Sequence, residues 1–214
     1  MNQTAVKLAI CIPSGEMVHM DFAVSLSAML ARLGVQRVRC SIYNAKTTIL
    51  SKGRQTLVNQ ALSTGSTHIL FLDSDMSFPA DTAFRLLQHD LDIVGAAYPT
   101  RREERLMNSA QKRWGERLKA GPDDGVVEVD YIGFGVILFR AEVFRRIEKP
   151  WFPIEYRGVD PEKGEIWVGE DFGFCEKARA AGYRVHVDAG LSWQVGHAGQ
   201  RTFRMQDIAG PEGR

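Results

Sequence analysis

The sequence predicts an α/β domain in which a mostly parallel sheet is covered by helices on both faces. Short apolar runs typical of buried strands alternate three times with segments of helical period, and glycines follow two of the helical segments where a helix would end. The length of 214 residues suits one such domain with a substantial core and is short for two. We therefore expect residues 1–214 to form a single domain.

The first two alternations start near the N-terminus. Val6–Pro13 is an apolar run stopped by a Pro-Ser-Gly turn, which predicts a buried strand. Met17–Gly34 follows with helical spacing and with Gly34 as its expected C-cap. Gln36–Tyr43 predicts the second strand, and Lys52–Gly65 predicts the second helix.

The third alternation contains a strand with a polar end. His68–Asp73 is an apolar run that ends on a carboxylate, and Ala80–His89 predicts the helix that follows. Leu91–Tyr98 then predicts a short strand. The polar end is where a ligand crevice is expected, because open α/β sheets bind ligands beyond the carboxyl ends of their strands.

The pattern changes in residues 99–124, here called the basic segment, which contains seven Lys or Arg and few residues of buried type. We expect an excursion from the domain that is partly mobile or ordered by ligand. Strand composition returns in Gly125–Arg140, and Ala141–Ile147 predicts a short helix. Glu170–Gly182 predicts a longer helix, and Tyr183–Asp188 the last strand before a tail that starts after about residue 198.

Composition excludes several classes of protein. Hydrophobic residues make up 44% and charged residues 25%, which rules out global disorder, and the net charge of +1 gives no overall attraction to nucleic acid. The three cysteines are widely spaced and form no CxxC pair, so we expect neither a disulfide framework nor a zinc site. No stretch approaches the roughly 20 apolar residues of a membrane span. A reducing cytoplasm is the expected location.

Asp73-Ser74-Asp75 is the first candidate site. Carboxylate oxygens at this spacing suit a hard divalent cation such as Mg²⁺ or Mn²⁺, which in turn can bridge a diphosphate. The alternative is a turn and helix N-cap made of ordinary Asp and Ser.

Two further candidates follow later strands. Glu170 and Asp171 open a predicted helix, where acids cap the free N–H groups, and a carboxylate held there is also well placed to act as a general base. His197 stands between glycines with no helical or strand period, and it is either structural or a ligand.

These pieces, in this order, resemble the GT-A fold of nucleotide-sugar-dependent glycosyltransferases, in particular the family 2-type and related bacterial or phage branches. The similar stretches cover most of Lys52–His197. They read KGRQTLVNQAL, ILFLDSDMSFP, DIVGAAYPTR, YIGFGVILFRAEVF, GEDFGFCEKARAAGYRV and VGH. The resemblance implies a Rossmann-like single domain.

The resemblance also implies roles for the candidate residues. Asp75 would bind Mn²⁺ or Mg²⁺ directly, Asp73 would touch the ribose or a metal-bound water, and His197 would complete the metal site. Asp171 would be the base that deprotonates the acceptor hydroxyl, with Glu170 binding the acceptor or fixing the site.

A further set of residues would hold the nucleotide-sugar donor under the same resemblance. They are Pro13, Ser14, Arg54, Ser74, Arg101, Gly133, Phe134 and Gly135. Arg54 is expected to reach a phosphate, and the GFG glycines would let backbone approach the sugar. The alternatives are a solvated surface position for Arg54 and a close-packed strand for the glycines. Arg101 would cover the diphosphate together with Arg102 and Arg105, unless this charge run is a solvated face.

The expected function is metal-dependent transfer of a sugar from a nucleoside diphosphate, UDP rather than GDP, to an acceptor hydroxyl with inversion. The acidic turn of family 2 after the second strand is replaced by YNAKTT, so base recognition stays open. Three alternatives also stay open: a haloacid-dehalogenase-like phosphatase, a sugar nucleotidyltransferase, and a non-catalytic nucleotide-sugar-binding module. The sequence does not indicate whether the acceptor is a carbohydrate, a lipid-linked molecule or a protein.

Overall fold

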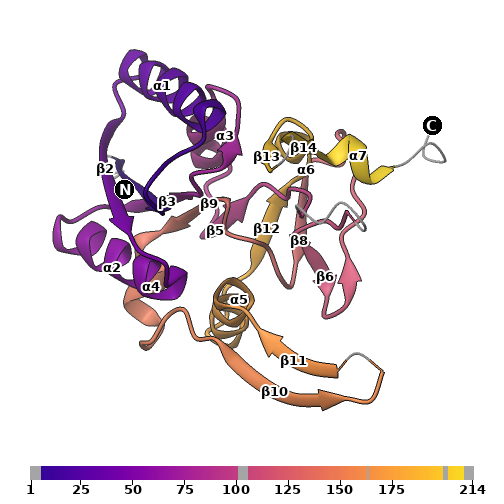
Figure 1. Cartoon of the computed structure of the whole chain (residues 1–214). Coiled ribbons are helices and arrows are strands. Elements are labelled where there is room, and N and C mark those ends of the chain that lie inside the picture. Colours follow the sequence, from indigo (N-terminus) through magenta and orange to yellow (C-terminus); the bar gives the residue numbers. More distant parts are fainter. Residues whose placement is uncertain (1–5, 101–105, 163, 200–201, 210–214) are drawn as a thin grey trace.

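The computed structural model describes residues 6–100, 106–162, 164–199 and 202–209, and within them the core is a seven-stranded sheet (Figure 1). In spatial order its strands are β2 (Arg39–Lys46), β1 (Lys7–Ser14), β3 (His68–Leu72), β9 (Val136–Arg140), β5 (Ile93–Gly95), β12 (Val185–Asp188) and β8 (Val126–Val129). The predicted α/β class is confirmed.

The sheet is mixed, although most of its strands share one direction. Strands β2, β1, β3, β5 and β12 run one way, whereas β9 and β8 run the other way. Three of the six pairings are antiparallel: two arise because β9 is inserted between β3 and β5, and the third joins β12 to β8 at the sheet edge. The run Gly125–Arg140 is two separate strands, β8 and β9, because β8 pairs with β12 whereas β9 pairs with β3 and β5.

Helices cover both faces of the sheet, as expected. The helices are α1 (Met20–Val35), α2 (Leu50–Ser63), α3 (Thr82–Gln88), α4 (Ala141–Arg146), α5 (Glu170–Ala180), α6 (Ala189–Ser192) and α7 (Met205–Ala209). Helices α1 and α3 pack on one face, and α2, α4 and α5 pack on the other (Figure 1). Alternate residues of β1 supply the two cores, since Leu8 and Ile10 join the first face and Ala9 and Cys11 the second.

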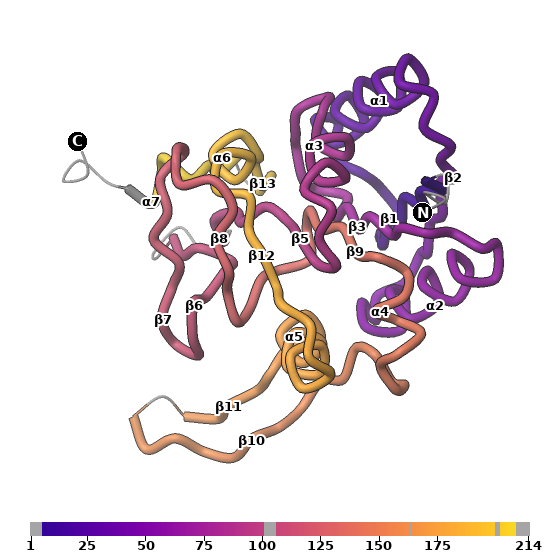
Figure 2. The backbone as a smooth tube through the Cα atoms, turned by 180° about the vertical axis from the view of Figure 1, so that it is seen from behind, coloured from indigo at the N-terminus to yellow at the C-terminus, as the bar shows by residue number. Residues whose placement is uncertain are grey.

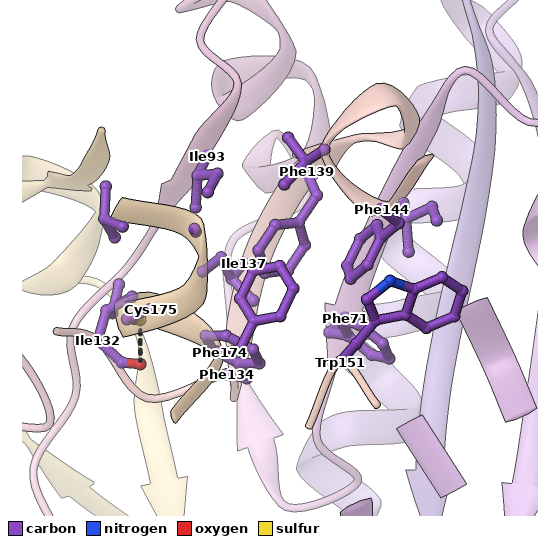
Figure 3. Packing of buried hydrophobic residues seen from close by; sticks show 14 of the residues in the cluster. Phe71, Ile93, Ile132, Phe134, Ile137, Phe139, Phe144, Trp151, Phe174 and Cys175 are labelled. Carbon is purple, nitrogen blue, oxygen red and sulfur yellow. Dashed lines mark hydrogen bonds between the residues drawn. The ribbon is translucent and has the colours of Figure 1, made fainter. Parts of the chain in front are cut away.

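The face covered by α2, α4 and α5 is rich in aromatic side chains. Phe139 and Phe144 have ring centroids 5.1 Å apart, and Phe174 lies within 5.3 Å of both (Figure 3). Rings in edge-to-face and tilted contacts add about 0.5–1.5 kcal/mol per pair to the energy of burial. This packing fixes the start of α5 against the sheet.

The helix ends differ from the prediction at one position. Helix α1 continues past Gly34 to Val35, and the turn is made by Arg37 in the left-handed region with φ 54°. Gly65 and Gly182 do follow α2 and α5 with φ of +70° and +88°, a conformation that suits glycine.

Two hairpins and a small sheet lie outside the predicted elements. The hairpins are β6 (Gln111–Arg113) with β7 (Glu116–Arg117), and β10 (Glu155–Asp160) with β11 (Gly164–Val168). The small sheet joins β4 (Met76–Ser77), β13 (Gly196–Ala198) and β14 (Thr202–Arg204). The described part of the basic segment has more buried residues than we expected, because the stretch 108–111 is buried. Both hairpins extend from the same side of the molecule (Figure 2).

All three cysteines lie within the described residues. Cys11, Cys40 and Cys175 are free thiols, and the two buried ones lie in the core. Within the described ranges, none of the helices combines the length and the apolar character that a bilayer crossing requires.

Candidate functional site

A cavity of about 330 Å³ lies at the carboxyl ends of β1 and β3, where an α/β sheet is expected to bind its ligand. It gathers residues from six separate parts of the chain. The predicted site residues that line it are Pro13, Ser14, Arg54, Asp73, Ser74, Asp75, Glu170, Asp171 and His197. Positions up to 184 residues apart, from Pro13 to His197, thus meet at one edge of the sheet.

Arg54 has a different place from the one the sequence suggested. It is 1% exposed, and its guanidinium donates to both carboxylate oxygens of Asp73 at 2.9 and 3.1 Å and to Glu170 Oε1 at 3.0 Å. The guanidinium also lies 5.3 Å from the ring centroid of Phe134. Arg54 is therefore not a solvated surface residue: it lines the cavity and joins α2 to the end of β3 and the start of α5, and its expected contact with a phosphate stays a prediction.

Asp73 and Phe134 both contact Arg54. Asp73 faces Arg54 with both oxygens, so the positive charge that a carboxylate needs at a strand end comes from within the chain. Phe134 is fully buried and packs against Arg54 and Phe174, so the structure does not bring it to the donor.

Asp75 and His197 are brought together by backbone pairing. In the small sheet His197 lies opposite Met76, and the Ala198 N–H donates to the Asp75 carbonyl at 2.8 Å. His197 Nε2 is 3.7 Å from Asp75 Oδ1, which is longer than a hydrogen bond. No period in the sequence around His197 indicated this strand.

The imidazole of His197 is held in one tautomer. Its Nδ1 lies 2.9 Å from the carbonyl oxygen of Pro99, which can only accept, so Nδ1 carries the proton and Nε2 presents its lone pair. The ring also makes an edge contact with Tyr98, at 5.0 Å between centroids. A histidine fixed through Nδ1 to a carbonyl is the usual state of a metal-ligating imidazole.

These two residues fit a divalent ion. Bonds of about 2.1 Å from Nε2 and from a carboxylate oxygen allow one ion to bridge donor atoms 3.7 Å apart. Within the described ranges, no group of three or more His, Cys, Asp or Glu is arranged to hold a metal. If an ion were held here, Asp75 and His197 would supply two of its ligands, and the remaining ligands would come from water or substrate oxygens.

Asp171 and Asp73 are both carboxylates of the cavity with a raised pKa, in each case chiefly through burial. For Asp171, burial and then the neighbouring charge of Glu170 raise the pKa to about 6, while Arg54 opposes both. Its Oδ1 accepts the Phe172 N–H at 2.8 Å, which fixes the side chain at the first turn of α5. A carboxyl group that changes protonation near neutral pH is suited to general base catalysis.

Tyr98 also lines the cavity, at the end of the run after β5, although nothing in the sequence singled it out. Its hydroxyl accepts the Gly135 N–H at 3.1 Å, and burial raises the pKa of Tyr98 well above its usual value. A Cβ on Gly133 or Gly135 would lie within 2.5–2.8 Å of Tyr98. Gly133 and Gly135 thus leave room for the tyrosine ring. Neither glycine lines the cavity described above, and Gly133 lines a second cavity next to it. An apolar run ending in tyrosine carries no signal for this role.

Arg101 and its neighbours Arg102 and Arg105 lie outside the described residues. Their expected contact with a diphosphate stays a prediction.

Comparison with known proteins identifies the fold. No protein-family model matches the chain, and no curated protein matches it in sequence. Among solved structures, A197 from STIV, a GT-A-like viral protein, superposes with a TM-score of 0.60 over 91% of this chain and 86% of A197, at 17% identity. The chain has a GT-A-like fold.

Two glycosyltransferase structures are similar to this GT-A-like fold at lower scores. One is Drosophila β1,4-galactosyltransferase 7 in complex with manganese, UDP-Gal and xylobiose, with a TM-score of 0.49, 16% identity, and 94% and 71% of the two chains covered. The other is TarS from S. aureus, with a TM-score of 0.48, 16% identity, and 86% and 57% covered. Similarity at these identities concerns the fold alone, so the functional interpretation depends on the residues of the cavity.

Proposed function

We propose that this chain is a metal-dependent glycosyltransferase that moves a sugar from a nucleoside diphosphate, UDP rather than GDP, to an acceptor hydroxyl. The observation that carries the proposal is the cavity at the strand ends. There a fixed imidazole and Asp75 lie 3.7 Å apart, and Asp171, with its pKa of about 6, lines the same space. Two side chains able to hold one metal ion, and a general base in the same crevice, would supply the two catalytic devices that sugar transfer from a diphosphate requires.

Asp75 and His197 would hold Mn²⁺ or Mg²⁺ in this proposal. When bound, the ion neutralises the negative charge that builds on the departing diphosphate. Asp73 would keep the turn in place through its bonds to Arg54 and would not need to bind the ion directly.

Asp171 would accept the proton of the acceptor hydroxyl as that oxygen attacks the anomeric carbon. Attack from the face opposite to the diphosphate inverts the anomeric configuration. Pro13 and Ser14 at the end of β1 are the proposed contacts for the base and ribose. The Ser14 hydroxyl accepts a hydrogen bond from Asn44 Nδ2 at 2.8 Å, so this edge of the cavity is fixed before ligand binds.

The geometry disfavours one alternative function, and the other two differ from the transferase in what they would release or turn over. A phosphatase of the haloacid-dehalogenase type needs the first aspartate as nucleophile, but both oxygens of Asp73 accept hydrogen bonds from buried Arg54. The nucleotidyltransferase would release pyrophosphate from a nucleoside triphosphate. The binding module would bind UDP and show no turnover.

The transfer step is tested by two variants in a UDP-release assay with UDP-glucose, UDP-galactose and their N-acetylated forms. Asp171→Asn should keep donor binding and slow UDP release by at least about 100-fold, because a general base contributes that much. Asp75→Ala should abolish release and its dependence on Mn²⁺. The control is Asp81→Ala, an exposed aspartate outside the cavity whose side chain does not cap α3. Full activity in Asp75→Ala would refute the metal site, and an unchanged rate in Asp171→Asn would remove it as base.

A further inference from the structure

A second cavity of about 710 Å³ adjoins the first. Tyr98, Asp171 and His197 line both cavities, so the proposed base stands at the boundary between them. The volume of this second cavity lies within the roughly 300–1,000 Å³ range of small-ligand pockets. A molecule in the second cavity would present a group to Asp171 from the side opposite to the β1 edge.

Two exposed tryptophans line this second cavity. Trp114 is 48% exposed and Trp167 is 57% exposed, although large aromatic side chains are usually buried. They come from different hairpins, β6–β7 and β10–β11, which extend on the same side of the molecule (Figure 2). Exposed indoles that meet at one cavity mark a binding surface.

Trp114 is held in place by its turn and by neighbouring rings. Its ring centroid is 5.5 Å from that of Tyr131 and 6.3 Å from that of Phe172. The buried Gln111 side chain accepts the Gly115 N–H at 2.7 Å, which fixes the turn that carries Trp114.

Trp167 is held within its own hairpin. Its ring lies 5.0 Å from the ring of Tyr156 on the paired strand, and its Nε1 donates to Glu165 at 3.1 Å. Both indoles are thus ordered before a ligand arrives, which lowers the entropy cost of binding.

The polar side chains of this cavity supply hydrogen-bond donors. The Thr100 and Ser109 hydroxyls accept backbone N–H groups at 3.2 and 3.0 Å, and Gln111 accepts through its oxygen. These bonds orient the side chains, while the two hydroxyl hydrogens and the Gln111 amide hydrogens have no acceptor among the described residues. Aromatic faces beside such donors suit a ring with apolar C–H faces and a rim of hydroxyls.

We infer that the acceptor is a carbohydrate, seated on Trp114 and Trp167 with one hydroxyl directed to Asp171. This inference rests on the proposed transferase function and names its acceptor. In the reaction the acceptor O–H proton passes to Asp171, and the acceptor oxygen forms a bond to the anomeric carbon of the donor. The bond between that carbon and the diphosphate oxygen breaks, and UDP leaves with the bonding electrons.

Two other acceptor classes are the rivals that the test must exclude. A nucleic-acid base would also stack on the indoles, and Arg117 in the lining carries a positive charge that its phosphates would seek. An acyl chain would leave the donors of Thr100, Ser109 and Gln111 without partners, at a cost for each buried group.

The test measures the binding of small glycosides by saturation-transfer NMR. The probes are the methyl β-glycosides of glucose, galactose, xylose and N-acetylglucosamine, with thymidine and octanoate as rivals. The wild type should bind at least one glycoside, with the strongest transfer to its ring C–H protons. Trp114→Ala and Trp167→Ala should each weaken this binding by about tenfold, the loss of one aromatic contact of about 1.4 kcal/mol.

The matched control is Val159→Ala, an exposed side chain on the same hairpin as Trp167 that does not line the cavity. It should bind the glycoside like wild type, and all three variants should keep their thermal shift with UDP and Mn²⁺. The carbohydrate acceptor is overturned if UDP with Mn²⁺ still raises the unfolding temperature but no glycoside binds, or if neither tryptophan variant changes glycoside binding. The transferase proposal would survive either result. Tryptophan-dependent binding of thymidine or octanoate in place of every glycoside also overturns it. Glycoside binding without any nucleotide response contradicts the transferase proposal and, with it, the acceptor role.

Discussion

At the scale of single residues, Asp171 connects the electrostatics of the cavity to its proposed chemistry. Burial and the neighbouring Glu170 carboxylate both disfavour the charged form of Asp171, which raises its pKa to about 6. A base must be deprotonated to work, so a pKa near 6 leaves Asp171 mostly charged at neutral pH and still able to take a proton.

The pKa of about 6 for Asp171 predicts how the rate of transfer depends on pH. The apparent kcat/KM should rise about tenfold per pH unit below pH 6 and level off above it, since only the deprotonated Asp171 is active. Glu170→Gln removes a negative neighbour, lowers the pKa of Asp171, and should move this rising limb to lower pH. Steady-state rates across the pH range measure both effects.

The control for this profile is Glu142→Gln on α4, whose exposed side chain lies outside the cavity. It should leave the profile unchanged. The role of Asp171 would be contradicted if kcat/KM did not change with pH around pH 6, or if it rose at the same pH in Glu170→Gln and in the wild type.

At the scale of elements, Arg54 ties three of them together. It lies on α2 and binds the carboxylates at the end of β3 and the start of α5. Buried ion pairs of this kind add little net stability, yet removing one partner leaves the others as uncompensated charges. Arg54 thus fixes the turn Asp73–Asp75 relative to the start of α5, which carries Asp171.

Arg54→Met should lower the free energy of unfolding by about 3 kcal/mol, because Asp73 and Glu170 lose their counter-charge. Urea denaturation measures the loss, and the control is Lys52→Met, an exposed basic residue on the same helix. Adding Asp73→Asn to Arg54→Met should recover part of the stability. Equal stability of Arg54→Met and Lys52→Met would show that the ion pairs do not hold these elements.

The elements also show what the sequence can predict. Strands such as β1 and β3, and helices such as α2 and α5, were predicted within a few residues because hydrophobic period and local caps define them. The direction of β9 was not predicted, since composition does not encode which neighbour a strand pairs with. The β10–β11 hairpin was missed because its side chains are mostly exposed and lack a buried period.

The site shows the same division between local and long-range information. The sequence pointed to Asp75, Asp171 and His197 through their order along the chain, and the structure brings them to one cavity. Arg54 was placed on the correct helix, but its partners lie 19 and 116 residues away and are invisible to local patterns. Tyr98 was missed for the same reason.

At the scale of the whole molecule, the fold places two adjoining cavities that share Asp171 in their lining. The first lies at the strand ends beside Asp75 and His197, and the second lies under the two hairpins beside Trp114 and Trp167. The GT-A-like fold supplies the sheet edge, and the hairpins add a wall to it. Donor and acceptor would thus approach Asp171 from different sides.

The measurement that tests this account most directly is the thermal shift of the protein with nucleoside diphosphates in the presence and absence of Mn²⁺. UDP with Mn²⁺ should raise the unfolding temperature by more than UDP and Mn²⁺ do separately, because the ion would link Asp75 and His197 to the diphosphate. Asp75→Ala and His197→Ala should each abolish the additional shift, while Asp81→Ala keeps it. The absence of a shift with every nucleoside diphosphate, with or without Mn²⁺, would contradict the proposal.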